Sequence, residues 1–509
     1  MTVQVGPPLS FHDVVRVAVH GERVTIAPEV ASRVGPSRQR VEDAIAAGAT
    51  LYGITTGFGG LSNVRIPYEE AKRLQRDIVR SHATAVGPAL PREAVRAMML
   101  LKARTFAFGV SGVRLELIER LVGMLNAEIH PVVPAQGSLG ASGDLALLAH
   151  LALPVMGEGE VEVSGATHPA RTRLRAAGIE PLELSYKEGL SLVNGTEAML
   201  ALGILTMVRA DALARCADLS GAMTLEACLG TDRAFDESLI ARRKHPGAPP
   251  VASNLRRLLK GSAIVASHRD SEHLVQDAYS LRCIPQVHGA YRDGMGYVGA
   301  TLEAELASAI DNPTVLPESG EIVSGGNFHG EALGLALDHL CLCLAGFATI
   351  AERRIARLVD PDLNNGLPAF LTPDPGRRSG FMLAHYTAAS LVSESRSACF
   401  PASADSIPTS AGQEDHVSMG ATSARRSARV LENTQQVLAI ETLAACQGLG
   451  LRAPLEPAPA TEAVLRAVRG VSPALDEDRS LAPDIAAVAA LTTGGGLVAA
   501  AEERIGALG

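Results

Sequence analysis

Two long segments of this chain carry apolar residues at helical spacing. Apolar helix faces of this length are typically buried in a bundle of helices. In the first segment, apolar side chains recur every four residues at Val298, Leu302, Leu306 and Ile310. In the second segment they follow a period of about 3.6 residues at Leu337, Leu340, Cys341, Leu344, Ala348, Ala351, Ile355 and Leu358. Apolar faces of this width predict long helices that are buried from several sides.

The composition supports a helical fold. Aromatic residues make up only 3% of the 509 residues and Trp is absent, whereas strands favour aromatic and β-branched side chains. We therefore expect an all-α fold: an elongated bundle of long central helices with a smaller mixed N-terminal part. We expect 1–509 to form one continuous fold, with the N-terminal part reaching to about 200 and the bundle and C-terminal helices covering about 201–509.

Local signals at the start of the chain predict one short helix and one short strand. Ser10 can cap a helix from Phe11 to about His20, and Gly21 ends it. The stretch 23–26 is typical of a brief strand, and little else in the sequence indicates strands.

Charge and cysteine content exclude several classes of partner. The formal net charge is −9 and the Arg residues are scattered, so we expect no nucleic acid as partner. No secretory signal is visible, and the longest uncharged run, 485–501, falls short of the ~20 residues that span a membrane. Seven cysteines without CxxC spacing indicate reduced thiols in the cytoplasm. No HExxH motif or dense Cys and His cluster predicts a catalytic metal.

The segment GSLGASGD at 137–144 places small residues directly before the apolar run LALLAHLAL. One interpretation is a plain helix start, in which Asp144 caps a helix from Leu145. In that case the chain is a helical scaffold whose backbone stays linear at this point.

A second interpretation of this segment is main-chain chemistry. If the Gly143 nitrogen attacks the Ala141 carbonyl carbon, a five-membered ring closes through both backbone carbons of Ser142. Loss of two waters then leaves an imidazolone that bears a methylidene. Gly143 tolerates the compressed turn that this requires, and Ser142 supplies the hydroxyl that is lost. The product is an electrophile that no ordinary side chain provides.

Eight segments in fixed order carry a resemblance that extends over nearly the whole chain. They are LYGITTGFG at 51–59, RSHATAVG at 80–87, GSLGASGDLALLAH at 137–150, KEGLSLVNGTE at 187–197, VQDAYSLRCIPQ at 275–286, DNP at 311–313, SGGNFHGE at 324–331 and PTSAGQEDHVSMG at 408–420. On these segments the chain resembles the aromatic amino acid ammonia-lyase family, whose members carry 4-methylideneimidazole-5-one (MIO). The resemblance implies the fold of the histidine and phenylalanine lyases, and MIO formed autocatalytically from Ala141, Ser142 and Gly143.

The resemblance also implies how the chemistry is divided. The substrate nitrogen adds to the methylidene carbon that derives from Ser142, and Tyr52 removes the β-proton as a phenolate. The ordinary pKa of tyrosine is ~10, so the glycine-rich loop around Tyr52 must favour deprotonation through nearby donors or dipoles.

Further contacts to substrate and ring follow from the same resemblance. Arg282 offers two parallel N–H donors to the α-carboxylate, and Tyr279 positions or assembles the ring. The resemblance further implies that Asn194 and Gln276 contact the ring oxygen and the substrate. Asn312 then lies beside the carboxylate, and Phe328 packs against the ring.

Two residues indicate the substrate. An imidazole needs polar partners, and the Glu414 carboxylate can accept an imidazole N–H beside His82. The resemblance gives this pair to the histidine-specific pattern, whereas phenylalanine lyases carry apolar residues and a Gln. We therefore expect non-oxidative deamination of L-histidine to trans-urocanate and ammonia. The alternatives are a tyrosine or phenylalanine ammonia-lyase and an MIO-dependent 2,3-aminomutase.

The family pattern also bears on assembly. It implies a homotetramer in which residues of three chains meet at each site, so we expect a mixture of inactive Tyr52→Phe and Ser142→Ala chains to regain activity.

The chain departs from the family pattern at positions that affect loop stiffness and pocket shape. The departures are Ala85 for Gly, Leu147 for Pro, Glu197 for Gln, Ala278 for Pro and Gly412 for Asn. Glu197 adds a negative charge near Asn194 if it faces the site. A nucleotide-binding interpretation of GMGYVG at 294–299 lacks the flanking strand and helix pattern that it requires.

Overall fold

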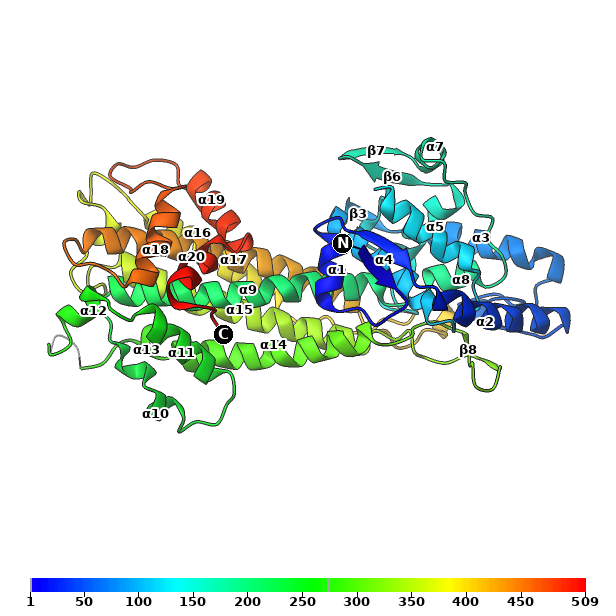
Figure 1. The fold of residues 1–509 in the computed structure, drawn as a ribbon, viewed down its shortest axis with the longest axis horizontal. Helices are drawn as coiled ribbons and strands as arrows, with labels where there is room; N and C mark the ends of the chain where they lie inside the picture. Colours follow the sequence, from blue (N-terminus) through cyan, green and yellow to red (C-terminus); the bar gives the residue numbers. More distant parts are fainter. Residues whose placement is uncertain (1, 272–274) are drawn as a thin grey trace. The chain divides into compact units, whose positions relative to one another are not determined.

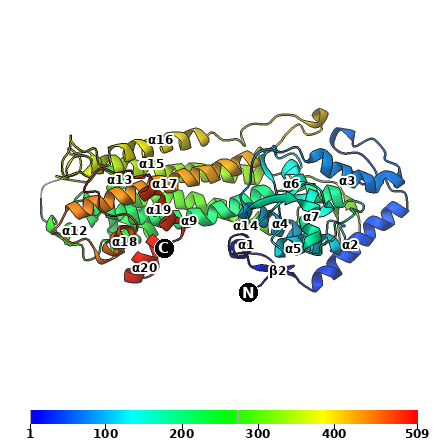
Figure 2. The same ribbon diagram turned by 90° about the horizontal axis from the view of Figure 1, so that it is seen from above.

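The computed structural model describes residues 2–271 and 275–509, which are grouped in two compact units (Figures 1 and 2). Unit 1 comprises Met1–Leu205, Gly299–Asp338 and Pro401–Arg425. Unit 2 comprises Thr206–Val298, His339–Phe400 and Arg426–Gly509. Unit 1 therefore takes in two segments from far along the chain, which sequence order alone does not reveal.

Four long helices each contain residues of both units. They are α9 (Glu197–Ala227), α14 (Ile284–Leu306), α15 (Glu331–Val359) and α17 (Gly420–Leu451). All eight residues of the predicted stripe within 337–358 are buried in α15, which confirms that prediction. The stripe predicted from Val298 ends earlier than expected, because α14 stops at Leu306 and Ile310 is buried outside the helix.

Length and composition alone make α15 capable of crossing a membrane, and it is the one single helix of this kind among the described residues. Of its most apolar window of 18 residues, 72% is buried within the structure. A helix that is apolar all round and buried is typical of a protein core. The uncharged run at 485–501 is divided between α19 (Ala482–Thr493) and α20 (Gly496–Ile505), which are bent by 57° at their break.

The remaining helices of unit 1 build the framework of the site. They are α1 (Phe11–Ala18), α2 (Glu29–Ala46), α3 (Ala71–His82), α4 (Arg92–Ala107), α5 (Leu115–Asn126), α6 (Leu145–Ala152), α7 (Ala170–Ala176) and α8 (Glu188–Val193). Every residue from Ala94 to Ala107 of α4 is buried, and α4 packs against α1 and α5. The predicted cap of α1 is confirmed, since Ser10 and Asp13 form a reciprocal capping box.

Nine short strands occur in the described residues, all of them outside unit 2. They are β1 (Thr2–Val5), β2 (Arg23–Ile26), β3 (Val86–Ala89), β4 (His130–Pro131), β5 (Pro134–Gln136), β6 (Glu160–Val163), β7 (Ala166–Pro169), β8 (Thr314–Val315) and β9 (Ile322–Val323). β1 pairs parallel to β2, with Thr2 opposite Arg23. The other pairings are antiparallel: β3 with β5, β8 with β9, and the order β4-β6-β7. The predicted strand at 23–26 is confirmed, and the other strands were missed.

The regular elements among the described residues of unit 2 are all helices. Its other helices are α10 (Glu237–Ile240), α11 (Ala248–Leu258), α12 (Ala263–Ser267), α13 (Tyr279–Arg282), α16 (Met382–Ala398) and α18 (Pro459–Arg469), together with α19 and α20. α18 packs against α20, and α11 contacts both. The expected all-α class is confirmed, since strands of two to four residues form only small ribbons on a helical fold.

Candidate active site

The segment 140–143 forms a tight turn whose backbone is held from two sides. Gly143 N donates to Gly140 O at 3.3 Å, and Gly195 N donates to Ser142 O at 3.2 Å. Ser142 has a φ of +52°, a left-handed conformation that is costly for a residue with a side chain. A Cβ on Gly143 would lie 2.0 Å from Gly195 O, so this position accepts only glycine. The segment 140–143 is therefore a tight turn with a left-handed Ser142 and no room for a side chain at Gly143.

Asp144 corrects the prediction that it caps the helix from Leu145. Among the described residues its carboxylate makes no capping bond to α6. Instead, Oδ2 accepts the backbone N–H groups of Ala198 and Met199, each at 2.9 Å, in the first turn of α9. The side chain thus ties the turn at 140–143 to α9, because it accepts two of the N–H groups that the start of that helix leaves without an intrahelical partner.

Full burial raises the pKa of the Asp144 carboxyl from 3.8 to about 7, and the charge of Glu197 adds to the rise. The N–H groups of Met199 and Ala198 act in the opposite direction. Burial wins because it removes the water that would stabilise the charged form.

Three helices of unit 1 that pack on one another bring the site together. α3 contacts α6 and α8, and α6 contacts α8. α3 ends at His82, α8 ends directly before Asn194, and α6 begins two residues after Gly143. The two helix ends and the helix start therefore meet in one small region.

Two cavities in this region share four residues of their walls: Tyr52, Gly59, Ser142 and Glu414. The larger, of about 540 Å³, is also lined by Ala141, Asn312 and Phe328. The smaller, of about 400 Å³, is also lined by His82 and Asn194. The structure thus brings together the predicted site residues of unit 1, and Gly143 completes the turn beside them.

Tyr52 lies in the cavity wall with its hydroxyl oxygen accepting the Gly59 N–H at 3.1 Å. Burial raises the pKa of Tyr52, the Gly59 N–H lowers it, and the charge of Glu414 raises it further. The expectation that the loop itself favours deprotonation is therefore wrong for the described residues of one chain, since a single N–H does not offset burial.

The loop that carries Tyr52 is fastened to the segment that carries Glu414. Gly60 N donates to Ser410 Oγ at 2.9 Å. At Gly59, with a φ of +50°, a Cβ would lie 2.1 Å from Ser410 Oγ. Because this approach needs a glycine, the contact fixes where Tyr52 sits relative to Glu414.

His82 and Glu414 occupy the same cavity wall. The His82 Nδ1 atom lies 3.0 Å from Ser81 Oγ, and the ring meets Phe58 edge-on at 6.4 Å between centroids. Burial lowers the pKa of His82, which favours the neutral imidazole. Glu414 Oε2 accepts the hydroxyl of Thr409 at 3.1 Å. The wall therefore presents a neutral imidazole beside a carboxylate.

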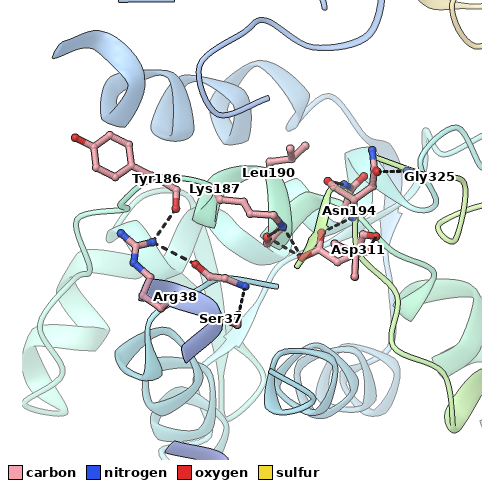
Figure 3. A network of polar contacts seen from close by, with 12 residues as sticks. Ser37, Arg38, Tyr186, Lys187, Leu190, Asn194, Asp311 and Gly325 are labelled. Atoms are coloured by element: carbon pink, nitrogen blue, oxygen red, sulfur yellow. Dashed lines mark hydrogen bonds and ion pairs between the residues drawn. The ribbon is translucent and has the colours of Figure 1, made fainter. Parts of the chain in front are cut away.

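Asn194 is oriented by a second asparagine. Its Nδ2 donates to Asn312 O at 2.6 Å, and Asn312 Oδ1 accepts the Gly325 N–H at 2.8 Å (Figure 3). The Oδ1 atom of Asn194 is buried and has no hydrogen-bond partner within 2–271 and 275–509. An orphaned acceptor of this kind in a cavity wall is typical of a site that awaits a ligand.

Sequence reasoning missed the buried network beneath these asparagines. Lys187 Nζ and Ser191 Oγ each donate to Asp311 Oδ2, at 2.9 and 2.8 Å (Figure 3). Asp311 Oδ1 accepts the N–H of Asn312 at 2.7 Å. Burial lowers the pKa of Lys187 and the Asp311 charge opposes the change. Both ends of this network lay inside segments that carry the family resemblance, but spacing in the sequence does not show that they pair.

A family model described as aromatic amino acid lyase matches residues 9–470. This chain belongs to the aromatic amino acid lyase family.

Relatives and solved structures agree with this assignment over the full length of the lyase. It is 50% identical over 511 residues to histidine ammonia-lyase of Sorangium cellulosum, and the match covers 99% of both chains. The crystal structure of histidine ammonia-lyase from Trypanosoma cruzi has a TM-score of 0.91 at 40% identity, covering 99% of this chain and 96% of that one. Tyrosine aminomutase of Streptomyces globisporus has a TM-score of 0.93 at 38% identity, covering 99% of both chains. The lyase fold is confirmed, and neighbours that carry different activities share it.

In this lyase the departure at Glu197 is compensated inside the protein. Glu197 Oε2 lies 3.0 Å from Lys102 Nζ, and both side chains are buried. Thr105 donates to the other carboxylate oxygen at 2.9 Å, and Lys102 also donates to Asn194 O. The negative charge of Glu197 is therefore neutralised by Lys102 and does not stand free beside Asn194.

Three predicted site residues of the lyase, Gln276, Tyr279 and Arg282, belong to unit 2. They are not among the residues that line the two cavities. Tyr279 is 72% exposed, and the Arg282 guanidinium lies 4.6 Å from its ring centroid. Arg282 Nε is buried without a partner in the described part of the chain. In a single chain these three side chains therefore lie outside the walls of the two cavities.

Proposed function

We propose that this lyase deaminates L-histidine non-oxidatively to trans-urocanate and ammonia. The observation that carries the proposal is that His82 and Glu414 line the same cavity wall as Tyr52 and Ser142. An imidazole that binds there meets a carboxylate acceptor and a neutral imidazole, partners that a phenyl ring could not use. The 50% identity to a relative named histidine ammonia-lyase supports the same choice.

We propose further that Ala141, Ser142 and Gly143 form MIO. The residues fit the group, because the turn is already left-handed at Ser142 and has no room for a side chain at Gly143. The Gly195 N–H already points at Ser142 O, the oxygen that the ring would retain. When formed, this group supplies an electrophilic carbon that serves as an electron sink.

The residues of this chain supply the rest of the reaction in the proposal. The Glu414 carboxylate accepts an N–H of the substrate imidazole, and His82 contacts its edge. Tyr52 Oη takes the proton from the substrate β-carbon. Because burial raises the pKa of Tyr52, a positive charge close to the phenolate is needed to lower it. Arg282 of a second copy holds the α-carboxylate by two parallel donors.

The assembly that follows from this division is a homotetramer with shared sites. Its support is that the Tyr279 side chain is 72% exposed and that Arg282 Nε is buried without a hydrogen-bond partner among the described residues of one chain. We propose that 1–509 works as one ammonia-lyase fold, with the N-terminal part to about 200 and the helical remainder from about 201. None of the seven cysteines, all of which the structure describes, forms a disulfide, as suits a reducing cytoplasm.

The proposal is tested by incubating the purified protein separately with L-histidine, L-tyrosine and L-phenylalanine. We expect urocanate and an equal amount of ammonia from histidine, and at most slow turnover of the other two. Turnover of tyrosine or phenylalanine without urocanate from histidine would refute it. Formation of a β-amino acid without release of ammonia would instead show an aminomutase.

A further inference from the structure

Three potential metal ligands converge beside the cavity that holds Ser142. His329 and His416 line this cavity together with Ser142 and Glu414. Glu331 is the first residue of α15 and lies next to both histidines. The three residues come from two segments that are about 85 positions apart, so the fold, not local sequence, brings them together.

The three side chains place their ligand atoms close to one another, and His329 Nε2 also lies 3.3 Å from the backbone oxygen of His416. One ligand atom of each residue lies within 4.8 Å of the other two. The imidazole rings of His329 and His416 are stacked, with 5.8 Å between centroids and 5° between planes. His416 Nε2 lies 3.9 Å from Glu331 Oε2.

The Glu331 carboxylate is the second, independent sign of a missing partner. Its Oε2 atom is buried and accepts no hydrogen bond from the residues that the structure describes. A buried carboxylate oxygen without a donor is unfavourable unless a cation satisfies it, although the Glu331 side chain as a whole is 33% exposed. The 3.9 Å to His416 Nε2 is at the outer limit of an ion pair and too long for a hydrogen bond.

We propose that His329, Glu331 and His416 bind one divalent transition-metal ion. Two imidazole nitrogens and one carboxylate oxygen are a donor set typical of Zn²⁺, and Co²⁺ and Ni²⁺ accept the same ligands. A tetrahedral ion with bonds of about 2.0–2.1 Å holds its ligand atoms roughly 3.4 Å apart. The side chain of His416 is 69% exposed, and in the proposal it turns inward to close the group around the ion.

The bound ion has a structural consequence for the lyase. His416 is two residues after Glu414, and His329 directly follows Phe328. Coordination therefore joins the segment that carries Glu414 to the start of α15 and to Phe328. The fourth coordination position is left to water or to a small ligand from the cavity, which both histidines line.

Binding is tested on the assembled full-length enzyme after chelator treatment and dialysis. Titration with Co²⁺, followed by calorimetry and by the visible absorption of the bound ion, is expected to give one ion per chain. His329→Asn, His416→Asn and Glu331→Gln each are expected to weaken binding about tenfold or more. The matched control is His12→Asn, which removes an exposed histidine of the same unit and is expected to leave the affinity unchanged.

Thermal unfolding supplies a second measurement. The midpoint of the wild type and of His12→Asn is expected to rise with Co²⁺ concentration, and those of the three ligand variants are not. Circular dichroism at room temperature shows that each variant is folded before titration. Absence of stoichiometric binding would overturn the proposal and leave the group as a weak His416 and Glu331 ion pair. The same affinity in the wild type and in all three ligand variants would overturn it equally.

Discussion

Lys102 and Glu197 form a buried ion pair, with 3.0 Å between Nζ and Oε2 and side chains that are 0% and 3% exposed. The same ammonium group donates to the backbone oxygen of Asn194. The pair therefore connects the interior of α4 to a residue of the cavity wall. It also explains how the chain tolerates a charged residue where its family pattern has a glutamine.

We expect Lys102→Met to destabilise the lyase strongly, because it leaves the Glu197 carboxylate buried without its partner. Loss of one member of a buried pair typically costs about 3–5 kcal/mol. The double variant Lys102→Met with Glu197→Gln is expected to recover part of this loss, since no buried charge then remains. Thermal unfolding midpoints of the four proteins in the cycle measure the effect.

The control for this cycle is an exposed ion pair. Arg73 lies 3.6 Å from Asp77, and its side chain is 65% exposed. Arg73→Met is expected to cost at most about 1 kcal/mol. Equal midpoint shifts for Lys102→Met and Arg73→Met would contradict the role given to the buried pair.

Asp144 predicts how stability depends on pH. Its carboxyl pKa is raised by burial from 3.8 to about 7 in the folded chain, so between these values the folded state binds more protons than the unfolded state. The stabilising contribution of the protonated group is complete below pH ~3.8 and is lost as the pH rises to about 7, in total roughly 4 kcal/mol.

The Asp144→Asn variant tests this dependence because its amide does not titrate, while its oxygen still accepts an N–H from α9. The midpoint of the wild type relative to the variant is expected to fall as the pH rises from 4 to about 7. A parallel pH dependence of the two proteins would show that Asp144 does not titrate in this window. Chemical denaturation at several pH values gives an independent measure.

Elements defined by long periodic patterns were predictable from the sequence, and contacts between distant segments were not. The stripe within 337–358 is buried because a pattern of that length fits only a helix in the core. The strands of two to four residues are too short to show alternation. The apolar pattern predicted a helix as far as Ile310, and this was wrong because α14 ends at Leu306.

The same distinction applies to the site. The family resemblance that the motifs carry was enough to name the residues that meet in unit 1. Asp144 was misassigned because capping rules are local, whereas its partners Ala198 and Met199 are 54 and 55 positions away. The pKa of Tyr52 was predicted in the wrong direction because burial is a tertiary property that the loop sequence does not contain.

His82 is expected to control the choice of substrate under the proposed function. His82→Leu removes a polar group from the cavity wall beside Glu414, and we expect kcat/KM for L-histidine to fall by about 100-fold. Turnover of L-phenylalanine is expected to fall less or to rise. Steady-state kinetics with both substrates measures the ratio.

Ser81→Ala is the matched control for His82→Leu. It removes only the hydroxyl that lies 3.0 Å from His82 Nδ1, so the ring stays and loses part of its orientation. We expect a loss of about tenfold or less in kcat/KM for histidine. If His82→Leu and Ser81→Ala changed both substrates in the same proportion, His82 would not be a specificity residue.

The division of the proposed site residues between the two units predicts which inactive variants restore activity when their chains are mixed. Tyr52 and Ser142 line the same cavities of unit 1 in one chain, so the mixture of Tyr52→Phe and Ser142→Ala that the family pattern suggested is now expected to stay inactive.

Arg282 belongs to unit 2, and in the proposed tetramer it serves a site of another chain. Dissociation and reassembly of equal amounts of Ser142→Ala and Arg282→Lys chains is therefore expected to restore activity. About a quarter of the sites then combine an intact Ser142 with an intact Arg282, because each is supplied by half of the chains. Mass spectrometry of the reassembled protein establishes that mixed tetramers have formed. Activity in the Tyr52 and Ser142 mixture, or none in the Ser142 and Arg282 mixture, would refute this division of the site between chains.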